Sequence, residues 1–348
     1  MIEVHMRQYK AAVIGCGGRS NPHIEAYKFF DNADVVACCD PVEERRNERA
    51  KEFNIKPYAD ARDMLETEQP DIVHITTTPN VRLDIMSLVS DCNVPLCTVE
   101  KPIATGVADW QALCELEAAS STKFAVCHQF RWQKDFMKCR EAIASGKLGA
   151  VKFVDISAGM NISGQGTHIL NYGMALNGDV PVTRVFGAAS GLSEDTVHPA
   201  PATTVGYLTF ENGVRALWST GPTAPKSGDP TTDWQHVRAA AYAESGRVNY
   251  EEFGKWEIVS PDGTESGDFG SVGEWWQNNL RAQAAFHKAM FAWLEDDACI
   301  PGTNLKQSLH EWNVVLALYA SALYRTPIDI ADFNPPADLF AQLIKALQ

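Results

Sequence analysis

A short apolar strand that runs directly into a glycine-rich turn is the feature that most limits the fold of this chain. Residues 9–14 (Tyr-Lys-Ala-Ala-Val-Ile) suit a buried strand, and Gly15-Cys-Gly-Gly-Arg-Ser20 leads into a helical pattern over residues 22–30. In a dinucleotide-binding fold, the first glycine permits the tight turn and the second lets the backbone approach a pyrophosphate. The following helix offers free N–H groups to the phosphates. Ser20 stands at the third glycine position as a small substitute.

An acidic residue follows at the distance that this interpretation requires. A second expected strand, residues 34–39, ends at Asp40, which lies 25 positions after Gly15 (40 − 15). At about this spacing a carboxylate accepts hydrogen bonds from the adenosine ribose, and it repels a 2′-phosphate. The sequence therefore favours NAD over NADP. Arg45 and Arg46 would soften that preference if they faced the cofactor, but a helix rich in Glu and Arg is more typical of a solvated surface.

Helices and strands then alternate, as they do in a doubly wound parallel sheet. The expected strands are residues 71–75, 94–99 and 123–127, and the expected helices are residues 42–53, 60–67, 82–90 and 107–119. Thr76-Thr-Thr-Pro-Asn80 closes one of these strands, where its hydroxyls would border the nicotinamide or serve as ordinary loop residues.

The strand over residues 94–99 ends abruptly in Glu100-Lys-Pro102. The carboxyl ends of the strands line the ligand site of an open parallel sheet, so a lysine there points its ammonium group at the bound molecule. Lys101 can exchange a proton with a hydroxyl or a carbonyl once burial and neighbours lower its pKa. The alternative is a lysine that merely caps a strand end in solvent.

After residue 127 the pattern becomes rich in β-strands. A helix over residues 134–144 precedes a series of strands joined by turns such as Glu211-Asn-Gly213, which predicts a large, open and mostly antiparallel sheet. Helices over residues 274–293 and 305–324 are expected to cover one face of it. The other face would be free for a homodimer or homotetramer contact. We therefore expect an N-terminal Rossmann domain, residues 1–127, and a C-terminal α/β domain for substrate and oligomerisation, residues 128–348.

Composition limits the class of partner. The formal net charge is −14, because 44 acidic residues outnumber 30 basic ones, which argues against a nucleic-acid surface. No apolar run approaches the length of a membrane span, and no signal peptide is evident. Nine cysteines without a Cys-x-x-Cys pair indicate neither a disulfide framework nor a zinc site, so we expect no metal and a cytoplasmic location.

Motifs along nearly the whole chain make the sequence resemble the glucose-fructose oxidoreductase and inositol dehydrogenase (Gfo/Idh/MocA) family. The resemblance is carried by residues 12–18, Asp40-Pro41, Thr78-Pro-Asn80, Glu100-Lys-Pro102, His128-Gln-Phe-Arg131, residues 143–149, His168 with Leu176-Asn-Gly178, and Ala320-Ser-Ala322. Glu-Lys-Pro is the most specific of these motifs. The resemblance implies an NAD(P)-dependent oxidoreductase acting on sugars, cyclitols or their derivatives.

The family's catalytic positions map onto this chain with one departure. Its lysine corresponds to Lys101, followed by a proline whose peptide is often cis, here Pro102, and its histidine corresponds to His168. The place of the family's aspartate is taken by Gly164, and Asn171 stands where a further aspartate is common. The resemblance thus implies that His168 exchanges the substrate proton while Lys101 polarises the same oxygen, without the usual negative charge beside them. His168 could instead be a structural histidine at a helix start.

These arguments together predict the following site residues. The expected cofactor contacts are Gly15, Cys16, Gly17, Gly18, Arg19, Ser20, Asp40, Arg45, Thr77, Thr78, Pro79, Asn80, Glu100, Lys101 and Pro102. The expected substrate contacts are Lys101, His128, Arg131, Gly164, His168, Asn171 and Tyr172. Arg131 could equally be an interdomain salt-bridge partner and His128 a buried core histidine, and Tyr172 could be a packing residue.

Three functions compete. The leading prediction is a dehydrogenase that transfers hydride from a secondary hydroxyl of a sugar, glycoside or cyclitol to exchangeable NAD. The second is an enzyme with tightly bound NAD that returns the hydride in each cycle, giving epimerisation, disproportionation or oxidation-assisted glycoside cleavage. Gly164 in the place of the family's aspartate supports this second possibility, because altered acid/base groups suggest altered chemistry. The third is a non-catalytic NAD or sugar sensor, against which Lys101 and His168 argue.

Overall fold

The structure is a computed structural model that describes residues 7–194, 200–227 and 233–348. Contacts divide the chain into two compact units. The first comprises residues 1–103, 112–129 and 280–308, and the second comprises residues 104–111, 130–279 and 309–348. The expected fold class, a Rossmann domain followed by a domain with a large and mostly antiparallel sheet, is confirmed.

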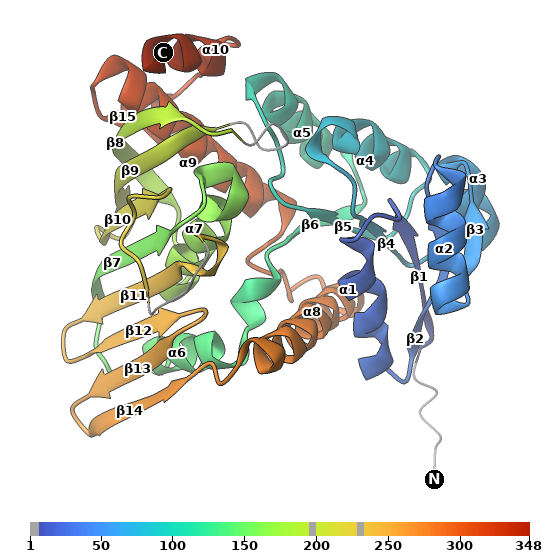
Figure 1. Cartoon of the computed structure of the whole chain (residues 1–348), viewed down its shortest axis with the longest axis horizontal. Helices are drawn as coiled ribbons and strands as arrows, with labels where there is room; N and C mark the ends of the chain where they lie inside the picture. Colours follow the sequence, from blue (N-terminus) through green and yellow to red (C-terminus); the bar gives the residue numbers. More distant parts are fainter. Residues whose placement is uncertain (1–6, 195–199, 228–232) are drawn as a thin grey trace. The chain divides into compact units, whose positions relative to one another are not determined.

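The first unit contains a six-stranded sheet in the order β3-β2-β1-β4-β5-β6, in which every pair of neighbours is parallel (Figure 1). Strands β4 and β5 are buried along their whole length, as expected for central strands of a parallel sheet. The elements are β1 (Tyr9–Ile14), α1 (Ser20–Glu25), β2 (Ala33–Cys39), α2 (Glu43–Phe53), β3 (Lys56–Tyr58), α3 (Ala61–Glu68), β4 (Ile72–Ile75), α4 (Arg82–Asp91), β5 (Leu96–Glu100), α5 (Val107–Ala119) and β6 (Lys123–Cys127).

The second unit is built on a nine-stranded sheet in the order β14-β13-β12-β11-β7-β10-β9-β8-β15. Among the described residues of this sheet, only β7 and β10 pair in parallel. Its strands are β7 (Val151–Ala158), β8 (Val182–Leu192), β9 (Pro201–Phe210), β10 (Arg215–Thr220), β11 (Val237–Ala243), β12 (Arg247–Glu251), β13 (Lys255–Ser260), β14 (Gly263–Asp268) and β15 (Ile328–Asp329). Its helices are α6 (Lys134–Ala144), α7 (Thr167–Leu176), α9 (Leu305–Tyr324) and α10 (Leu339–Leu347).

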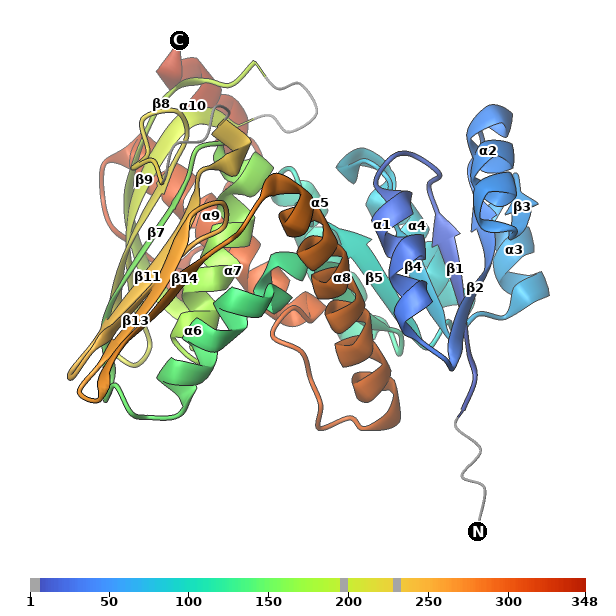
Figure 2. The ribbon, with the colours of Figure 1, turned by 60° about the horizontal axis from the view of Figure 1, so that its bottom comes forward.

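One face of this sheet is covered by α6, α7 and α9 (Figure 2). Gly187 and Gly206 allow Leu318 of α9 to lie against the strands, because a Cβ at either position would come within 3 Å of that side chain. Alternation then turns Val205 and Tyr207 to the opposite face, where they are 42% and 39% exposed. This is the face through which the sequence predicts self-association, which stays a prediction.

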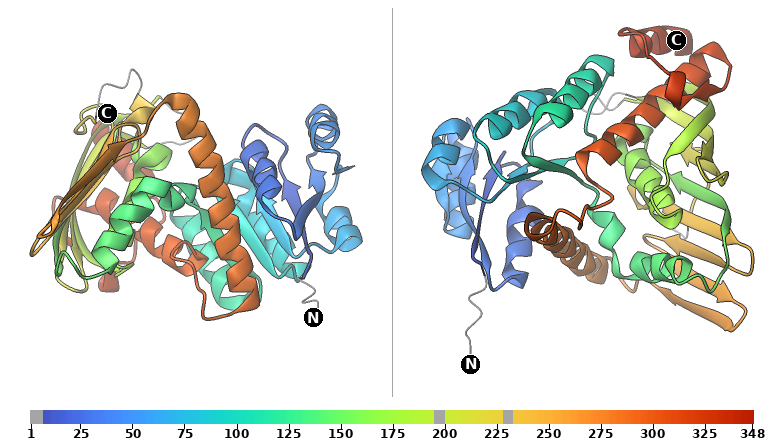
Figure 3. Two further views of the ribbon diagram at one scale, coloured as in Figure 1. Left: turned by 90° about the horizontal axis from the view of Figure 1, so that it is seen from below. Right: turned by 180° about the vertical axis from the view of Figure 1, so that it is seen from behind.

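Helix α8 (Val272–Glu295) departs from the expectation that it covers the second sheet. From Leu280 onward its residues belong to the first unit, where it lies beside α1 (Figure 3). Its Phe291 stacks on Tyr9 with 4.6 Å between ring centroids and contacts Tyr27 edge-on. The amphipathic pattern predicts a buried face correctly, but from Leu280 onward the apolar residues of α8 pack in the first unit and not on the second sheet. No helix among the described residues is long and apolar enough to cross a membrane.

Candidate functional site

The glycine-rich turn after β1 has the shape that a bound pyrophosphate requires. Gly15 has a φ of +98°, and a Cβ there would lie 2.9 Å from Cγ2 of Thr77. A Cβ at Gly17 or Gly18 would meet no atom within 4 Å, so the backbone faces open space at these two positions. The turn is therefore tight on its inner side and accessible on its outer side.

Asp40 is fixed at the end of β2 by backbone donors. Its Oδ2 accepts a hydrogen bond from the N–H of Cys16 at 2.8 Å, and its Oδ1 accepts one from the N–H of Val42 at 2.9 Å. Each carboxylate oxygen has a second lone pair, so Asp40 can still accept from a ribose hydroxyl. Arg45 is exposed on α2, whereas Arg46 donates to the carbonyl of Pro41.

The loop after β4 borders the same turn. The hydroxyl of Thr76 donates to the carbonyl of Gly15 at 2.6 Å, and that of Thr78 donates to Oδ1 of Asn80 at 2.6 Å. The Oγ1 of Thr77 is buried and has no partner in the described chain. An unsatisfied buried hydroxyl next to an open glycine turn fits a ligand group that would complete it. Together with Asp40, these features fit a bound dinucleotide.

Lys101 follows β5, and its peptide bond to Pro102 is cis, as the family resemblance implies. Burial lowers the pKa of its amine to about 8, and the positive charges of Arg19 and Arg82 act in the same direction, while Glu100 opposes them. The structure therefore supplies the lowered pKa that the sequence argument required of this lysine.

Glu100 is buried and does not point into solvent. Its Oε1 accepts hydrogen bonds from Nε of Arg19 at 2.7 Å and from Nε2 of His23 at 3.0 Å. Burial alone would raise the pKa of Glu100, but the charge of Arg19 and the hydrogen bonds from both neighbours hold it well below its usual value. The expected cofactor contacts Arg19 and Glu100 are thus an internal ion pair in this structure.

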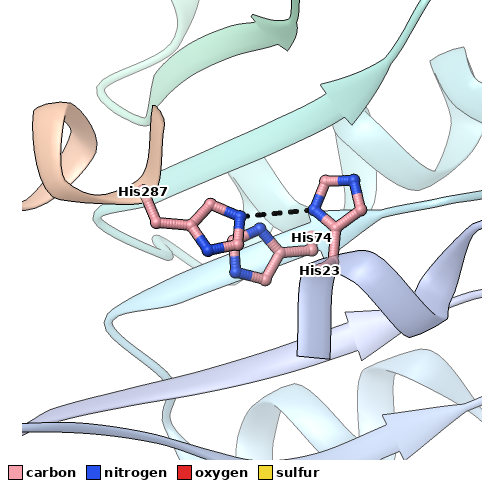
Figure 4. Close-up of side chains that lie close together, drawn as sticks. All are labelled: His23, His74 and His287. Atoms are coloured by element: carbon pink, nitrogen blue, oxygen red, sulfur yellow. Dashed lines mark hydrogen bonds between the residues drawn. The ribbon is translucent and has the colours of Figure 1, made fainter. Parts of the chain in front are cut away.

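Three histidines that the sequence analysis did not single out meet inside the first unit (Figure 4). His23 comes from α1, His74 from β4 and His287 from α8, and all three are fully buried. Burial lowers the pKa of each. Nδ1 of His23 lies 3.4 Å from Nε2 of His287, and Nε2 of Gln283 lies 3.0 Å from the latter atom.

The grouping is close enough for metal ligands but poorly directed for them. The rings of His74 and His287 are stacked, with 4.4 Å between centroids and 23° between planes, so their lone pairs do not converge on one ion. The hydroxyls of Tyr27 and Thr98 already contact the two nitrogens of His74, at 2.7 and 2.6 Å. We read the cluster as a hydrogen-bonded part of the core that ends on Glu100.

In the second unit, His168 lies in the first turn of α7, after a π-helical turn over Ile162–Gly166. Its ring stacks on Phe130 with 4.5 Å between centroids and 25° between planes. Stacking of this kind fixes the plane of the imidazole. One turn further along α7, Nδ2 of Asn171 donates to Oε1 of Glu311 at 2.6 Å, and Oδ1 of Asn171 accepts from Arg131 at 3.4 Å.

Several predicted substrate contacts have partners within the protein. Arg131 is buried and forms an ion pair with Asp179 of the same unit, rather than the interdomain salt bridge that was its alternative role. His128 is 3% exposed. Tyr172 is fully buried and stacks on Phe136 with 4.0 Å between centroids. This placement favours packing over a substrate contact for Tyr172.

Glu252, which the sequence analysis did not single out, anchors the hydroxyl of Tyr172. Its Oε2 accepts from the hydroxyls of Tyr172 at 2.5 Å and Tyr250 at 2.9 Å, and its Oε1 accepts from Nε1 of Trp275 at 2.7 Å. Burial raises the pKa of Glu252 to about 7, although these donors oppose the rise.

The place of the family's aspartate is too tight for a side chain unless its neighbours shift. A Cβ at Gly164 would lie 3.1 Å from Cε of Met160 and 3.2 Å from Oδ1 of Asn161. Asn161 uses that oxygen to accept from the N–H of Gly164 at 2.7 Å. A buried carboxylate from α9, that of Glu311, instead contacts Asn171, and no sequence pattern singled this residue out.

Residues 9–128 match the family model described as "Oxidoreductase family, NAD-binding Rossmann fold", the model of the Gfo/Idh/MocA proteins. Residues 9–128 thus form an NAD-binding Rossmann domain of the Gfo/Idh/MocA type. It is 31% identical over 231 residues to the D-apiose dehydrogenase of Paraburkholderia graminis, an alignment that covers 61% of this chain and 60% of that enzyme. It is 22% identical over 280 residues to the myo-inositol 2-dehydrogenase of Thermotoga maritima, covering 75% and 80% of the two chains.

A solved structure extends the likeness in fold to both units. An oxidoreductase from Agrobacterium radiobacter, crystallised with NAD+, L-tartaric acid and magnesium, superposes with a TM-score of 0.80. The match covers 93% of this chain and 99% of the other at 19% identity, so it shows a common fold. The NAD-binding Rossmann fold expected from Gly15 and Asp40 is thereby confirmed.

Proposed function

We propose that this protein is an NAD-dependent dehydrogenase that oxidises a secondary hydroxyl of a sugar, glycoside or cyclitol. The observation that carries the proposal is the setting of Lys101. Its amine is buried and has a pKa lowered to about 8, and its backbone is joined through Arg82 to Thr77, beside the glycine turn. When bound, NAD accepts the hydride.

The protein's own groups would handle the proton. As an ammonium, Lys101 donates a hydrogen bond to the substrate oxygen and stabilises the negative charge that develops as its proton leaves. His168, held flat against Phe130, is the proposed proton acceptor. Asn171 lies on the same face of α7 and can donate to or accept from a hydroxyl, which suits a substrate rich in hydroxyl groups.

NAD is the proposed cofactor in preference to NADP because of Asp40. Its carboxylate is fixed by the N–H groups of Cys16 and Val42, and a phosphate on the neighbouring ribose hydroxyl would meet this negative charge. The exposed position of Arg45 leaves that repulsion unrelieved.

The test is turnover of polyols and sugars by purified protein, followed by NADH absorbance, with Lys101→Met beside the wild type. Loss of a group that acts on the reacting oxygen should lower kcat by roughly 100-fold or more. Lys51→Met, an exposed lysine of α2, is the matched control and should retain activity. Undiminished turnover by Lys101→Met would refute the assignment.

A cycle with tightly bound NAD remains the second candidate, because Gly164 and Met160 replace the family's acidic group by an apolar contact. Denaturing freshly purified protein and measuring released nicotinamide cofactor separates the two. Near-stoichiometric release favours the internal cycle, and an empty protein favours exchangeable NAD.

The proposal includes a cytoplasmic homodimer or homotetramer that associates through the open face of the nine-stranded sheet. Phe186, Val205 and Tyr207 expose apolar surface there. Light scattering of wild type and Tyr207→Glu would test it, because a charge in a buried contact should dissociate the oligomer.

A further inference from the structure

Arg82 is a buried guanidinium that binds backbone carbonyls. Its Nε and Nη2 donate to the carbonyl of Thr77 at 3.1 and 2.8 Å, Nη2 also reaches the carbonyl of Lys101 at 3.3 Å, and Nη1 donates to the carbonyl of Pro102. These bonds join the segment after β4 to the segment after β5. Because the guanidinium is planar and carries several donors in a fixed fork, a lysine could not make the same set of bonds.

The charge of Arg82 is uncompensated at close range. The residue is 3% exposed, and within residues 7–194, 200–227 and 233–348 it forms no ion pair with a carboxylate. An isolated buried cation is costly, and burial accordingly lowers the pKa of Arg82 to about 10. The positive charge of Arg82 therefore affects the pKa of nearby groups, including that of Lys101.

Glu100, which ends β5 directly before Lys101, provides the opposite charge. Because its carboxylate can only accept, Nε2 of His23 carries the proton in their hydrogen bond, and Nδ1 of His23 is left with a lone pair. That lone pair faces His287 at 3.4 Å (Figure 4). Nε2 of Gln283 lies 3.5 Å from the same nitrogen. Helix α8 thus fixes His23, and His23 and Arg19 fix Glu100.

We propose that Arg82 and Glu100 are positioning residues for Lys101: Arg82 holds the backbone that carries the lysine, and Glu100 places a fixed counter-charge next to it. The inference rests on the proposed function for its catalytic meaning. It goes further because it assigns roles to two residues that touch neither the substrate nor the reacting atoms.

The charges around Lys101 predict the direction in which its pKa shifts when either residue is replaced. The charged or titratable groups that act most strongly on its amine are Glu100, Arg19, Arg82 and Cys127. Burial raises the pKa of the Cys127 thiol to about 12, so this thiol is neutral near pH 7. Glu100 raises the pKa of Lys101, whereas Arg82 and Arg19 lower it. Removing Arg82 and removing Glu100 must therefore shift this pKa in opposite directions, which a general loosening of the fold would not do.

The experiment measures the protonation of Lys101 without requiring turnover. Wild type, Arg82→Gln and Glu100→Gln are treated with a trace of acetic anhydride over a series of pH values, and acetylation at Lys101 is followed by peptide mass spectrometry. In Arg82→Gln the midpoint of labelling should rise by roughly one pH unit, and in Glu100→Gln it should fall by a similar amount. Arg62→Gln, which removes an exposed arginine of α3, is the control and should leave the midpoint unchanged.

Arg82→Lys separates charge from geometry. This variant keeps the positive charge but cannot bind the carbonyls of Thr77, Lys101 and Pro102 at once. The pH midpoint of acetylation at Lys101 should therefore stay near that of the wild type, while kcat falls by roughly tenfold. Full kcat in Arg82→Lys would overturn the positioning role of Arg82.

The outcomes distinguish this inference from the proposed function. Opposite midpoint shifts in a protein without dehydrogenase activity would support the positioning roles and refute the function. Midpoints that stay fixed, or move in the same direction, would refute the inference even in an active enzyme. If Arg82→Gln does not fold, the Glu100→Gln midpoint alone decides, because a rise or no change there contradicts the proposal.

Discussion

The carboxyl group of Glu252 makes the stability of this protein depend on pH in a way that one substitution should remove. Glu252 follows β12, is 1% exposed, and accepts hydrogen bonds from Tyr172, Tyr250 and Trp275. Burial raises its pKa from 4.5 to about 7, so the folded protein holds a proton that the unfolded chain has released. Glu252→Gln keeps the shape of the protonated group and cannot ionise.

The sign follows from proton binding. Between pH 4.5 and about 7 the unfolded state binds fewer protons at this position, so the free energy of unfolding falls as pH rises. The contribution is fully present below pH 4.5 and is lost as pH rises through about 7. At 1.36 kcal/mol per pH unit, the loss amounts to about 3 kcal/mol. The wild type should therefore lose about 3 kcal/mol of its free energy of unfolding between pH 4.5 and pH 8 that Glu252→Gln does not lose.

Urea unfolding of both proteins, followed by tryptophan fluorescence at a series of pH values, measures this difference. The contributions of the other titrating groups cancel because both proteins contain them. Trp275→Phe is the matched control, because it removes one donor to Glu252 but keeps the carboxyl group. Its pH-dependent loss of stability should persist and grow, since the bond from Trp275 favours the ionised form. Parallel curves for wild type and Glu252→Gln would show that Glu252 does not keep its proton in the folded protein.

Four further outcomes follow from the geometry. If the ammonium form of Lys101 polarises the substrate oxygen, kcat/KM should fall as pH rises through about 8, and a rate that keeps rising to pH 10 would contradict this role. Asp40→Ser should improve the kcat/KM for NADP relative to NAD by roughly tenfold, measured with both cofactors at saturating substrate, because a carboxylate that repels the 2′-phosphate is gone. Glu311→Gln should lower kcat/KM by roughly tenfold, since it weakens a charge-assisted bond that orients Asn171; equal values for the two proteins would mean that Asn171 needs no such support. Gly164→Asp should lower the free energy of unfolding by about 1–3 kcal/mol in urea titrations because Met160 and Asn161 occupy the space, and Gly164→Asp with Met160→Ala should recover part of that loss.

Local patterns predicted the parts of the fold and of the site that depend on neighbours in sequence. The turn at Gly15, the acid at Asp40 and the strand end at Lys101 each require a few consecutive residues, and the structure gives them the expected local surroundings. The edge strand β3 was missed because Lys56-Pro-Tyr58 contains a proline and only three residues.

Long-range partners were beyond the reach of such patterns. Arg82 binds carbonyl groups, which every residue has, so no sequence signal marks its partners. His23, His74 and His287 lie far apart in the chain and meet only after α8 has packed on the first unit. The amphipathic pattern of α8 predicts that one face is buried, but it does not say which sheet buries it. The role of Glu311 depends likewise on α9 reaching α7.

The contribution of α8 to the first unit also has a consequence for how the protein is made. Strand β1 is synthesised before α8, so Tyr9, His23 and Tyr27 receive their partners His287 and Phe291 only after the intervening segments of the second unit have left the ribosome. The nascent N-terminal domain therefore has an unfinished apolar surface while the second unit is being translated. We expect a fragment that ends near residue 130 to bind chaperones or aggregate, and added peptide 280–308 to improve its solubility.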